Sequence, residues 1–343
     1  MTAHERQFPR PNTDFTVSGQ KLRGAAIGYC ALLTVFWFVA RFFGLKALDE
    51  YPVSTFLSFA LLFAPYWFFG FGAAEMLRAR LKTPALTVAV SAVLALPYFV
   101  LEAPRGNVQA PMAAVLIAIP VLVAAVLKNW PRAGNWADFL VLGAVGLLID
   151  LGLLTAAWPL HAAGVSVWPA GLSGFPKLMM ANVALYGYLV VKPIESMGYD
   201  LRPRLADLKY GLREFFFCAP MVLSLGFLLG FLHWHGGTLR LWTAPSAWTF
   251  TFFMIALPEE LFFRGLVQNL LERHVSQRRA LCLASVLFGL SHFNKGATFN
   301  WNYVLLATIA GLFYGRAWHA QRRLFASSIT HASVDTVWSI WFR

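Results

Sequence analysis

Long apolar runs are the feature that most constrains this chain. A helix needs about 20 mostly apolar residues to cross roughly 30 Å of hydrocarbon, and the sequence holds about eleven such runs. None alternates with a period of two, as membrane-barrel strands do. The sequence therefore predicts an all-α polytopic transmembrane helical bundle, and the basic residues predict that its N-terminus is cytoplasmic. The expected spans are 24–45, 53–77, 84–101, 112–127, 137–157, 174–191, 213–233, 243–271, 280–296, 300–318 and 324–342.

The composition agrees with a membrane protein. Only 13% of the residues are charged and 58% are hydrophobic, whereas a soluble domain carries about 25% charged residues. So few charges exclude an ordinary soluble enzyme, and a disordered chain would need the opposite balance. Three cysteines, Cys30, Cys218 and Cys282, are too few for a secreted disulfide scaffold. The expected surroundings of the chain are therefore a lipid bilayer.

The net charge of +12 would suit a nucleic-acid partner, but the positions of the basic residues explain it differently. Twenty of the 28 lysines and arginines fall in the amino-terminal tail and in every second loop after it, and six fall in the opposite loops. Basic residues accumulate on the cytoplasmic side of membrane proteins. The pattern predicts a cytoplasmic amino terminus, a carboxyl terminus outside, and no nucleic-acid partner.

One long charged connection, about 193–212, divides the chain. It predicts an amino-terminal transmembrane bundle of unknown role, residues 1–212, and a carboxyl-terminal unit, residues 213–343. Ionisable side chains are costly in hydrocarbon, so each one inside a span is a candidate for function. The second unit concentrates them in three stretches: Leu257–Gly265, Phe288–Phe293 and Thr330–Asp335.

The depth of these groups predicts that they meet. Counting about 1.5 Å per helical residue from the nearest cytoplasmic basic residues places Glu259, His292, His331 and Asp335 roughly 12 to 21 Å into the membrane. Three helices that enter from different loops would thus bring their polar groups to one slab. We expect one water-accessible cavity there.

Spacing along the helices assigns the groups different tasks. Glu260 and Arg264 are four residues apart and should form a supporting ion pair that fixes the helix. Glu259 has no such partner one turn on and is expected to face the cavity. His331 and Asp335 are also four apart, so Asp335 can orient the imidazole.

These residue types suit the activation of water. Glu259 with His292 and His331 can polarise water as a general base with its assistants. Two histidines and a carboxylate can instead hold a zinc ion, here through His292 and His331, with an open position for water. Phe288 lies one turn from His292 and is expected to wall the site. Spacing leaves both mechanisms open.

The three stretches resemble the motifs of the CAAX-prenyl protease and bacteriocin-processing (CPBP) family of intramembrane proteases. The family shows Glu-Glu-x-x-x-Arg, Phe-x-x-x-His and His-x-x-x-Asn or -Asp on successive core helices. The resemblance covers roughly residues 243–340. The motifs read here, in the same order, Glu259-Glu260-x-x-x-Arg264, Phe288-x-x-x-His292 and His331-x-x-x-Asp335.

The resemblance implies hydrolysis of a peptide bond in a membrane-embedded protein or peptide, either membrane-anchored or lipid-modified. Glu259 and His292 would activate water, and His331 with Asp335 would assist. Asp335 stands where the prenyl-protein proteases have Asn, which favours a bacterial branch, and hence a bacterial inner membrane, over a farnesylated substrate. Both metalloprotease and metal-free glutamate mechanisms are argued for the family, so zinc stays open.

Two other functions compete with the peptidase. Asp150, Glu259 and the histidines, all buried in spans, would also suit a proton-coupled transporter, although the sequence lacks the internal repeat typical of many transporters. The other is a non-catalytic scaffold or immunity protein that binds a membrane partner.

Overall fold

All regular elements among the residues that this computed structural model describes are helices. The structure describes residues 19–42, 51–154, 157–158, 174–234, 244–295 and 299–342, and within these ranges the only extended pairing is an isolated bridge between Trp234 and Phe342. The predicted all-α class is confirmed. Six helical segments are long and apolar enough to cross a membrane, by length and composition: Leu22–Arg41, Pro52–Phe69, Pro84–Arg105, Ala110–Asn129, Gly174–Val191 and Leu205–Leu228. The count of eleven spans and the orientation remain predictions.

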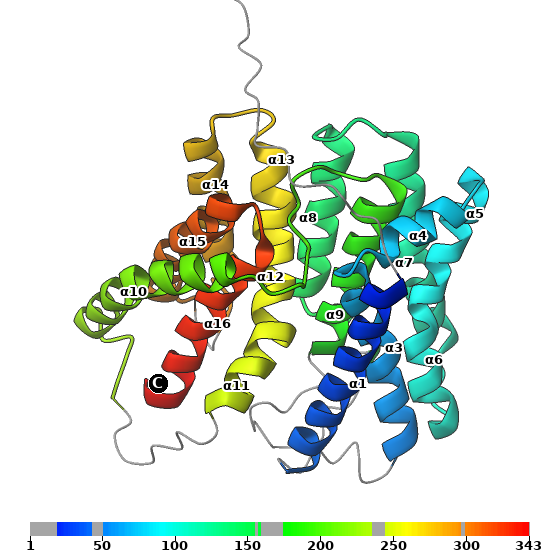
Figure 1. Cartoon of the computed structure of the whole chain (residues 1–343), viewed down its shortest axis with the longest axis horizontal. Coiled ribbons are helices and arrows are strands. Elements are labelled where there is room, and N and C mark those ends of the chain that lie inside the picture. Colours follow the sequence, from blue (N-terminus) through cyan, green and yellow to red (C-terminus); the bar gives the residue numbers. More distant parts are fainter. Residues whose placement is uncertain are drawn as a thin grey trace, which may run out of the picture.

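Helices of the first 191 residues stand together on one side of the molecule (Figure 1). Most are built of Leu, Val, Ala and Phe with few charges, which is why they are apolar on all sides. Their bounds are α1 Gly19–Phe42, α3 Pro52–Phe69, α4 Ala73–Arg80, α5 Pro84–Val90, η1 Ser91–Ala95, α6 Leu96–Glu102, η2 Ala103–Arg105, α7 Ala110–Asn129, α8 Trp136–Asp150, α9 Gly174–Leu185 and η4 Tyr186–Val191.

The remaining helices form the other side, where α10 runs across the view in Figure 1 and packs against α15 and α16. Helix α15 also packs along α14. Their bounds are α10 Leu205–Leu228, α11 Ala244–Thr251, η6 Phe252–Ala256, α12 Leu257–Glu260, η7 Leu261–Gln268, α13 Asn269–Leu271, α14 Gln277–Leu290, α15 Trp301–Gln321 and α16 Leu324–Trp341.

The run expected over 53–77 is not one helix. Helix α3 ends at Phe69, and α4 starts only at Ala73, after Gly72 with a φ of 93°. The Leu201 side chain packs so closely on Gly70 that any side chain at position 70 would overlap it. The Leu201 backbone N–H donates to the Gly70 carbonyl at 3.0 Å. Apolar composition hid this break because glycine interrupts a helix without adding polarity.

Residues 244–271 form one continuous helix whose hydrogen-bond pattern changes along its length. The turns at Phe252–Ala256 and Leu261–Gln268 are wide π-turns, and the short α-helical segment Leu257–Glu260 lies between them. Pro258 has no N–H to continue the α-helical ladder. Wide turns of this kind occur often at functional sites, and here they flank the paired carboxylates.

The run expected over 280–296 also ends early. Helix α14 stops at Leu290, and the His292 backbone N–H donates to the Gly289 carbonyl at 2.9 Å in the turn that follows. The Ser291 hydroxyl donates to the Phe288 carbonyl at 2.8 Å. The sequence predicts His292 inside a helix, but the residue lies in the turn that follows the end of α14.

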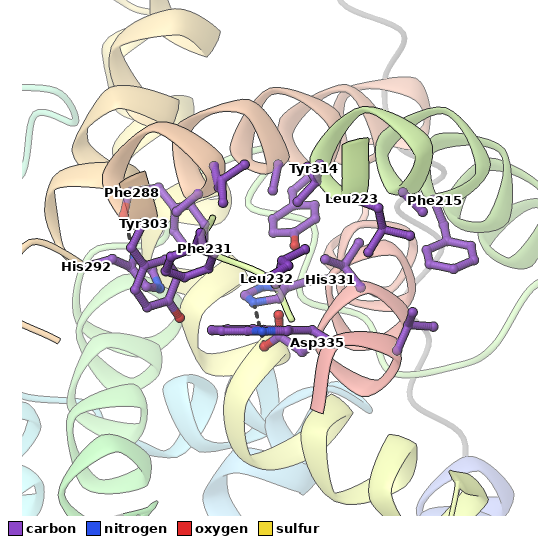
Figure 2. A pocket seen from close by; sticks show the side chains of 18 residues that line it. Phe215, Leu223, Phe231, Leu232, Phe288, His292, Tyr303, Tyr314, His331 and Asp335 are labelled. Carbon is purple, nitrogen blue, oxygen red and sulfur yellow. Dashed lines mark hydrogen bonds and ion pairs between the residues drawn. The ribbon is translucent and has the colours of Figure 1, made fainter. Parts of the chain in front are cut away.

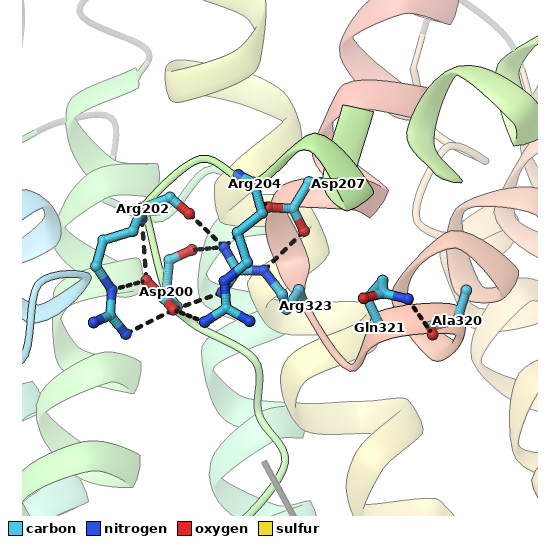
Figure 3. A network of polar contacts seen from close by, with 7 residues as sticks. All are labelled: Asp200, Arg202, Arg204, Asp207, Ala320, Gln321 and Arg323. Carbon is cyan, nitrogen blue, oxygen red and sulfur yellow. Dashed lines mark hydrogen bonds and ion pairs between the residues drawn. The ribbon is translucent and has the colours of Figure 1, made fainter. Parts of the chain in front are cut away.

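The charged connection that the sequence marks as a boundary is tied to its surroundings by ion pairs (Figure 3). Arg323, at the start of α16, is 4% exposed and donates to Asp200 at 2.6 Å and to Asp207 at 2.8 Å. Arg202 and Arg204 pair with the same Asp200 carboxylate. The connection is thus fixed to α10 and α16, and the division at residue 212 remains a prediction.

Candidate functional site

Glu260 is the fully buried anchor of the site. It is 0% exposed and lies 3.2 Å from Arg264 Nε, the ion pair that the spacing predicts. Its other contacts come from α16: His331 Nδ1 lies 2.8 Å from Glu260 Oε1, and the Ser327 hydroxyl donates to Oε2. Glu260 therefore joins two helices that are far apart in the sequence.

Arg264 completes this buried arrangement from the next turn of the helix. Its guanidinium lies over the ring of Phe288, 5.0 Å from the centroid, and near the ring of Tyr314 at 5.8 Å. A cation over aromatic faces is stabilised by the ring quadrupole. Phe288 thus contacts the supporting ion pair as well as the histidines, a wider role than the wall that the sequence predicts.

His331 is held among carboxylates and rings (Figure 2). Its ring stacks on Tyr314 with 4.4 Å between centroids, and it is 2% exposed. Nε2 lies 3.4 Å from Asp335 Oδ2 and 3.8 Å from Glu259 Oε2, while Nδ1 contacts Glu260. Because carboxylate oxygens accept, an imidazole with such oxygens near both nitrogens is suited to donate hydrogen bonds.

His292 has a different arrangement. Its Nδ1 lies 2.8 Å from the Phe288 carbonyl oxygen, which can only accept, so Nδ1 carries the proton. In the neutral ring the lone pair is then on Nε2, the atom that can accept a proton or hold a water. Phe288 and Tyr303 pack on the ring, with centroids 4.8 and 4.7 Å away.

Glu259 is the exposed member of the carboxylate pair. Its side chain is 19% exposed and faces a cavity of about 460 Å³. Glu259 has no partner one turn on, but it has one from another helix: Lys177 Nζ lies 2.7 Å from Glu259 Oε1. Lys177 comes from α9, 82 residues earlier, so no local spacing could reveal the pair.

The segment that carries these residues is similar to a known protein family. Residues 240–337 match the family model of the Rce1-like type II CAAX prenyl endopeptidases. All three motifs lie inside this Rce1-like segment. The match makes this segment similar to a family of peptidases, and with the apolar helices it indicates a multi-pass membrane protein. No curated protein and no solved structure matches the chain.

Two cavities meet the Rce1-like segment. The larger one, of about 460 Å³, lies between α8 and α9 on one side and η7 and α14 on the other, and it contains Glu259, Lys177 and His292. The smaller, of about 60 Å³, lies between α10, α15 and α16 and is lined by His331, Asp335 and again His292 (Figure 2). Most of the remaining lining of both is apolar.

The predicted zinc site depends on how the possible ligand side chains of the Rce1-like segment are grouped. In the described part of the chain, no three His, Cys, Asp or Glu side chains are grouped so that they could hold a metal ion. His331 Nδ1 lies 2.8 Å from Glu260 Oε1, and its Nε2 lies 3.4 Å from Asp335 Oδ2. The residues as arranged do not fit a three-ligand zinc site. Zinc held by His292 and His331 remains a prediction.

Sequence reasoning missed several parts of the site. The basic-residue pattern counts Lys177 among the six residues of the outer loops, and it says nothing of Ser327, Tyr303 or Tyr314. Ser327 and Tyr314 lie in helices that were predicted, but their polar groups look ordinary in sequence. Lys177 alone gave a signal, as a cation isolated in an otherwise apolar run.

Proposed function

We propose that the protein is an intramembrane endopeptidase that hydrolyses a peptide bond of a membrane-anchored or lipid-modified protein or peptide. The observation that carries the proposal is the position of the Glu259 carboxylate. It faces a large cavity, and its Oε2 lies 3.8 Å from His331 Nε2. The neighbouring Glu260 is instead paired with Arg264 and His331. A carboxylate that is open to a cavity and lies beside imidazoles suits the activation of water.

The proposed reaction assigns each group one step. Glu259 takes one proton from a water molecule, while the Nε2 lone pair of His292 accepts a hydrogen bond from the other. The water oxygen then attacks the peptide carbonyl carbon. His331 donates a hydrogen bond to the oxyanion that forms, a contribution that is often the largest in acyl transfer. When the C–N bond breaks, the proton held by Glu259 passes to the leaving amine, and Asp335 keeps the His331 ring in place.

The exposure of the two glutamates separates their roles. Glu260 has no accessible surface and accepts from Ser327 while pairing with Arg264 and His331, so it has no room for water. Glu259 is open to the cavity. Glu260 is therefore a supporting residue, and the base is Glu259.

The cavity supports a substrate with an apolar part. Its walls include Phe139, Leu142, Phe262 and Leu287, whereas its polar groups gather around Glu259. Pockets of this size and lining bind apolar groups and orient them through a few polar contacts. We propose that the substrate places an apolar segment or lipid chain against these walls and its peptide bond at Glu259.

The test is cleavage by the purified full chain in lipid nanodiscs. The probes are a quenched fluorescent peptide with an S-farnesyl cysteine four residues from its end and the same peptide without lipid. Glu259→Gln should lower kcat at least about 100-fold, as loss of a general base does. Glu102→Gln is the control, because Glu102 is a glutamate of α6 that lines neither cavity. Equal cleavage by wild type and Glu259→Gln would reject the proposal.

A further inference from the structure

Lys177 is an isolated cation on the face of α9 that meets the Rce1-like segment. Its neighbours in the helix, from Phe175 to Leu185, are all buried and mostly apolar. Its own side chain is 26% exposed, and it lines the large cavity beside Glu259. An ammonium in such surroundings is costly unless it is paired, and here its partner is the proposed base.

The position of Lys177 is fixed by contacts on the far side of α9. The Asn182 amide donates to the Leu62 carbonyl of α3 at 2.7 Å. Tyr66, also in α3, donates to the Phe253 carbonyl at 3.1 Å, just before the carboxylate pair. Helices α3, α9 and the 244–271 helix therefore form one packed unit. The Lys177 ammonium contacts Glu259 from within this unit.

The two oxygens of Glu259 have different neighbours. Oε1 is 2.7 Å from Lys177, and Oε2 is 3.8 Å from His331. A charge-assisted contact of 2.7 Å is among the strongest that a carboxylate forms, so it selects one rotamer. In this rotamer Oε2 points toward His331.

We propose that Lys177 is a positioning residue for Glu259, so that α8 and α9 of the amino-terminal bundle belong to the active site. This inference rests on the proposed function. It concerns a residue outside the matched 240–337 segment. It assigns a role to the amino-terminal helices: they close one wall of the substrate cavity and supply the contact that aims the base.

A positioning role and a purely structural ion pair have different consequences. A structural pair affects how much protein folds, whereas a positioning residue affects the turnover of the folded protein. Lys192 offers a matched control: its ammonium lies 2.7 Å from Asp138, both side chains are almost fully buried, and neither lines the cavity. Loss of Lys192 should lower the thermal stability and leave kcat per folded molecule unchanged.

The experiment compares Lys177→Met, Lys177→Arg, Lys192→Met, Glu259→Gln and the double variant Lys177→Met/Glu259→Gln. All are full-length proteins in nanodiscs, assayed with both peptide probes and with thermal unfolding measured in parallel. Lys177→Met should lower kcat roughly 10- to 100-fold with KM within about twofold, and arginine should restore most of the rate. The double variant should be no slower than Glu259→Gln alone, since residues that act as a unit are not additive.

The outcomes separate the two proposals. If Glu259→Gln is inactive and Lys177→Met turns over like wild type, the positioning role is rejected and the peptidase stands. A loss of kcat per folded molecule in Lys192→Met equal to that in Lys177→Met also rejects the positioning role. If the wild type cleaves neither peptide, or Glu259→Gln cleaves both as fast, the proposed function fails and the inference fails with it.

Discussion

Two neighbouring carboxylates in α12 show how strongly surroundings decide what a residue can do. Glu259 and Glu260 have the same side chain and are adjacent in sequence, yet one is 19% exposed and the other has no exposure at all. Successive residues point about 100° apart around a helix, so one faces the cavity and the other faces α16. The chemistry of the pair follows from this rotation.

The buried position of Glu260 predicts a large effect on stability. Glu260→Gln keeps the shape of the side chain but leaves the Arg264 guanidinium, also 0% exposed, without its counter-ion. Breaking a buried pair by removing one partner costs about 3–5 kcal/mol. We expect a clear fall in the apparent unfolding temperature of the detergent-solubilised protein. The double variant with Arg264→Met should recover part of it, and an unchanged temperature in Glu260→Gln would contradict the prediction.

At this scale the sequence predicts contacts that are local and misses those that are not. Glu260 with Arg264 and His331 with Asp335 are one helical turn apart, and both pairs are present in the structure. The 2.7 Å contact between Lys177 and Glu259 depends on how α9 packs on a helix 82 residues later. Packing of this kind leaves no periodic signature in a single sequence.

Elements were predicted well where composition alone decides them and poorly where backbone geometry does. The expected run 324–342 corresponds to α16, Leu324–Trp341. The early end of α14 and the wide turns around Pro258 were not predicted. Hydrophobicity reports which residues avoid water, and it does not report how a helix ends or where it widens. The wide turns matter for function because they flank the residues that carry the carboxylates.

The connection over residues 192–204 predicts a pH dependence of stability. Burial alone would raise the pKa of Asp200, but hydrogen bonds from Arg202 and the charge of Arg323 outweigh it, so the pKa lies below its ordinary value. A carboxyl group with a lowered pKa stabilises the fold above its unfolded pKa of about 4, and this stabilisation is lost as the pH falls through the folded-state pKa.

The measurement is the difference in apparent unfolding temperature between wild type and Asp200→Asn from pH 7 down to pH 3. Wild type should be the more stable at neutral pH, and the gap should close below about pH 4. Asp150→Asn is the control, because the Asp150 carboxylate lies 3.8 Å from Lys295 with both side chains partly exposed, and such pairs contribute little. A gap that does not change with pH would contradict the prediction.

The whole molecule brings two sets of helices together around one cavity, and only one of them carries the matched family segment. The 240–337 match spans Glu259, His292 and His331. It does not account for α8 and α9, which line the same cavity. The sequence divides the chain at its charged connection, whereas the cavity is built from residues on both sides of it.

Metal content is a property of the whole purified protein and tests the zinc prediction directly. The arrangement of His331 between carboxylates predicts less than one zinc per chain after purification without added metal. Elemental analysis should be combined with cleavage assays with and without a strong chelator, and the metal-free mechanism predicts equal rates. Stoichiometric zinc together with loss of cleavage on chelation would favour the two-histidine site instead.

The fastened connection limits how the cavity can open. Leu201 is hydrogen-bonded to Gly70 of the first set of helices, and Asp200 is hydrogen-bonded to Arg323 of the second set. The same short stretch therefore contacts both sets. The two sets cannot slide apart as separate bodies while these contacts hold. Because α3 and α9 also pack on the 244–271 helix, a substrate enters a cavity whose two walls stay in register.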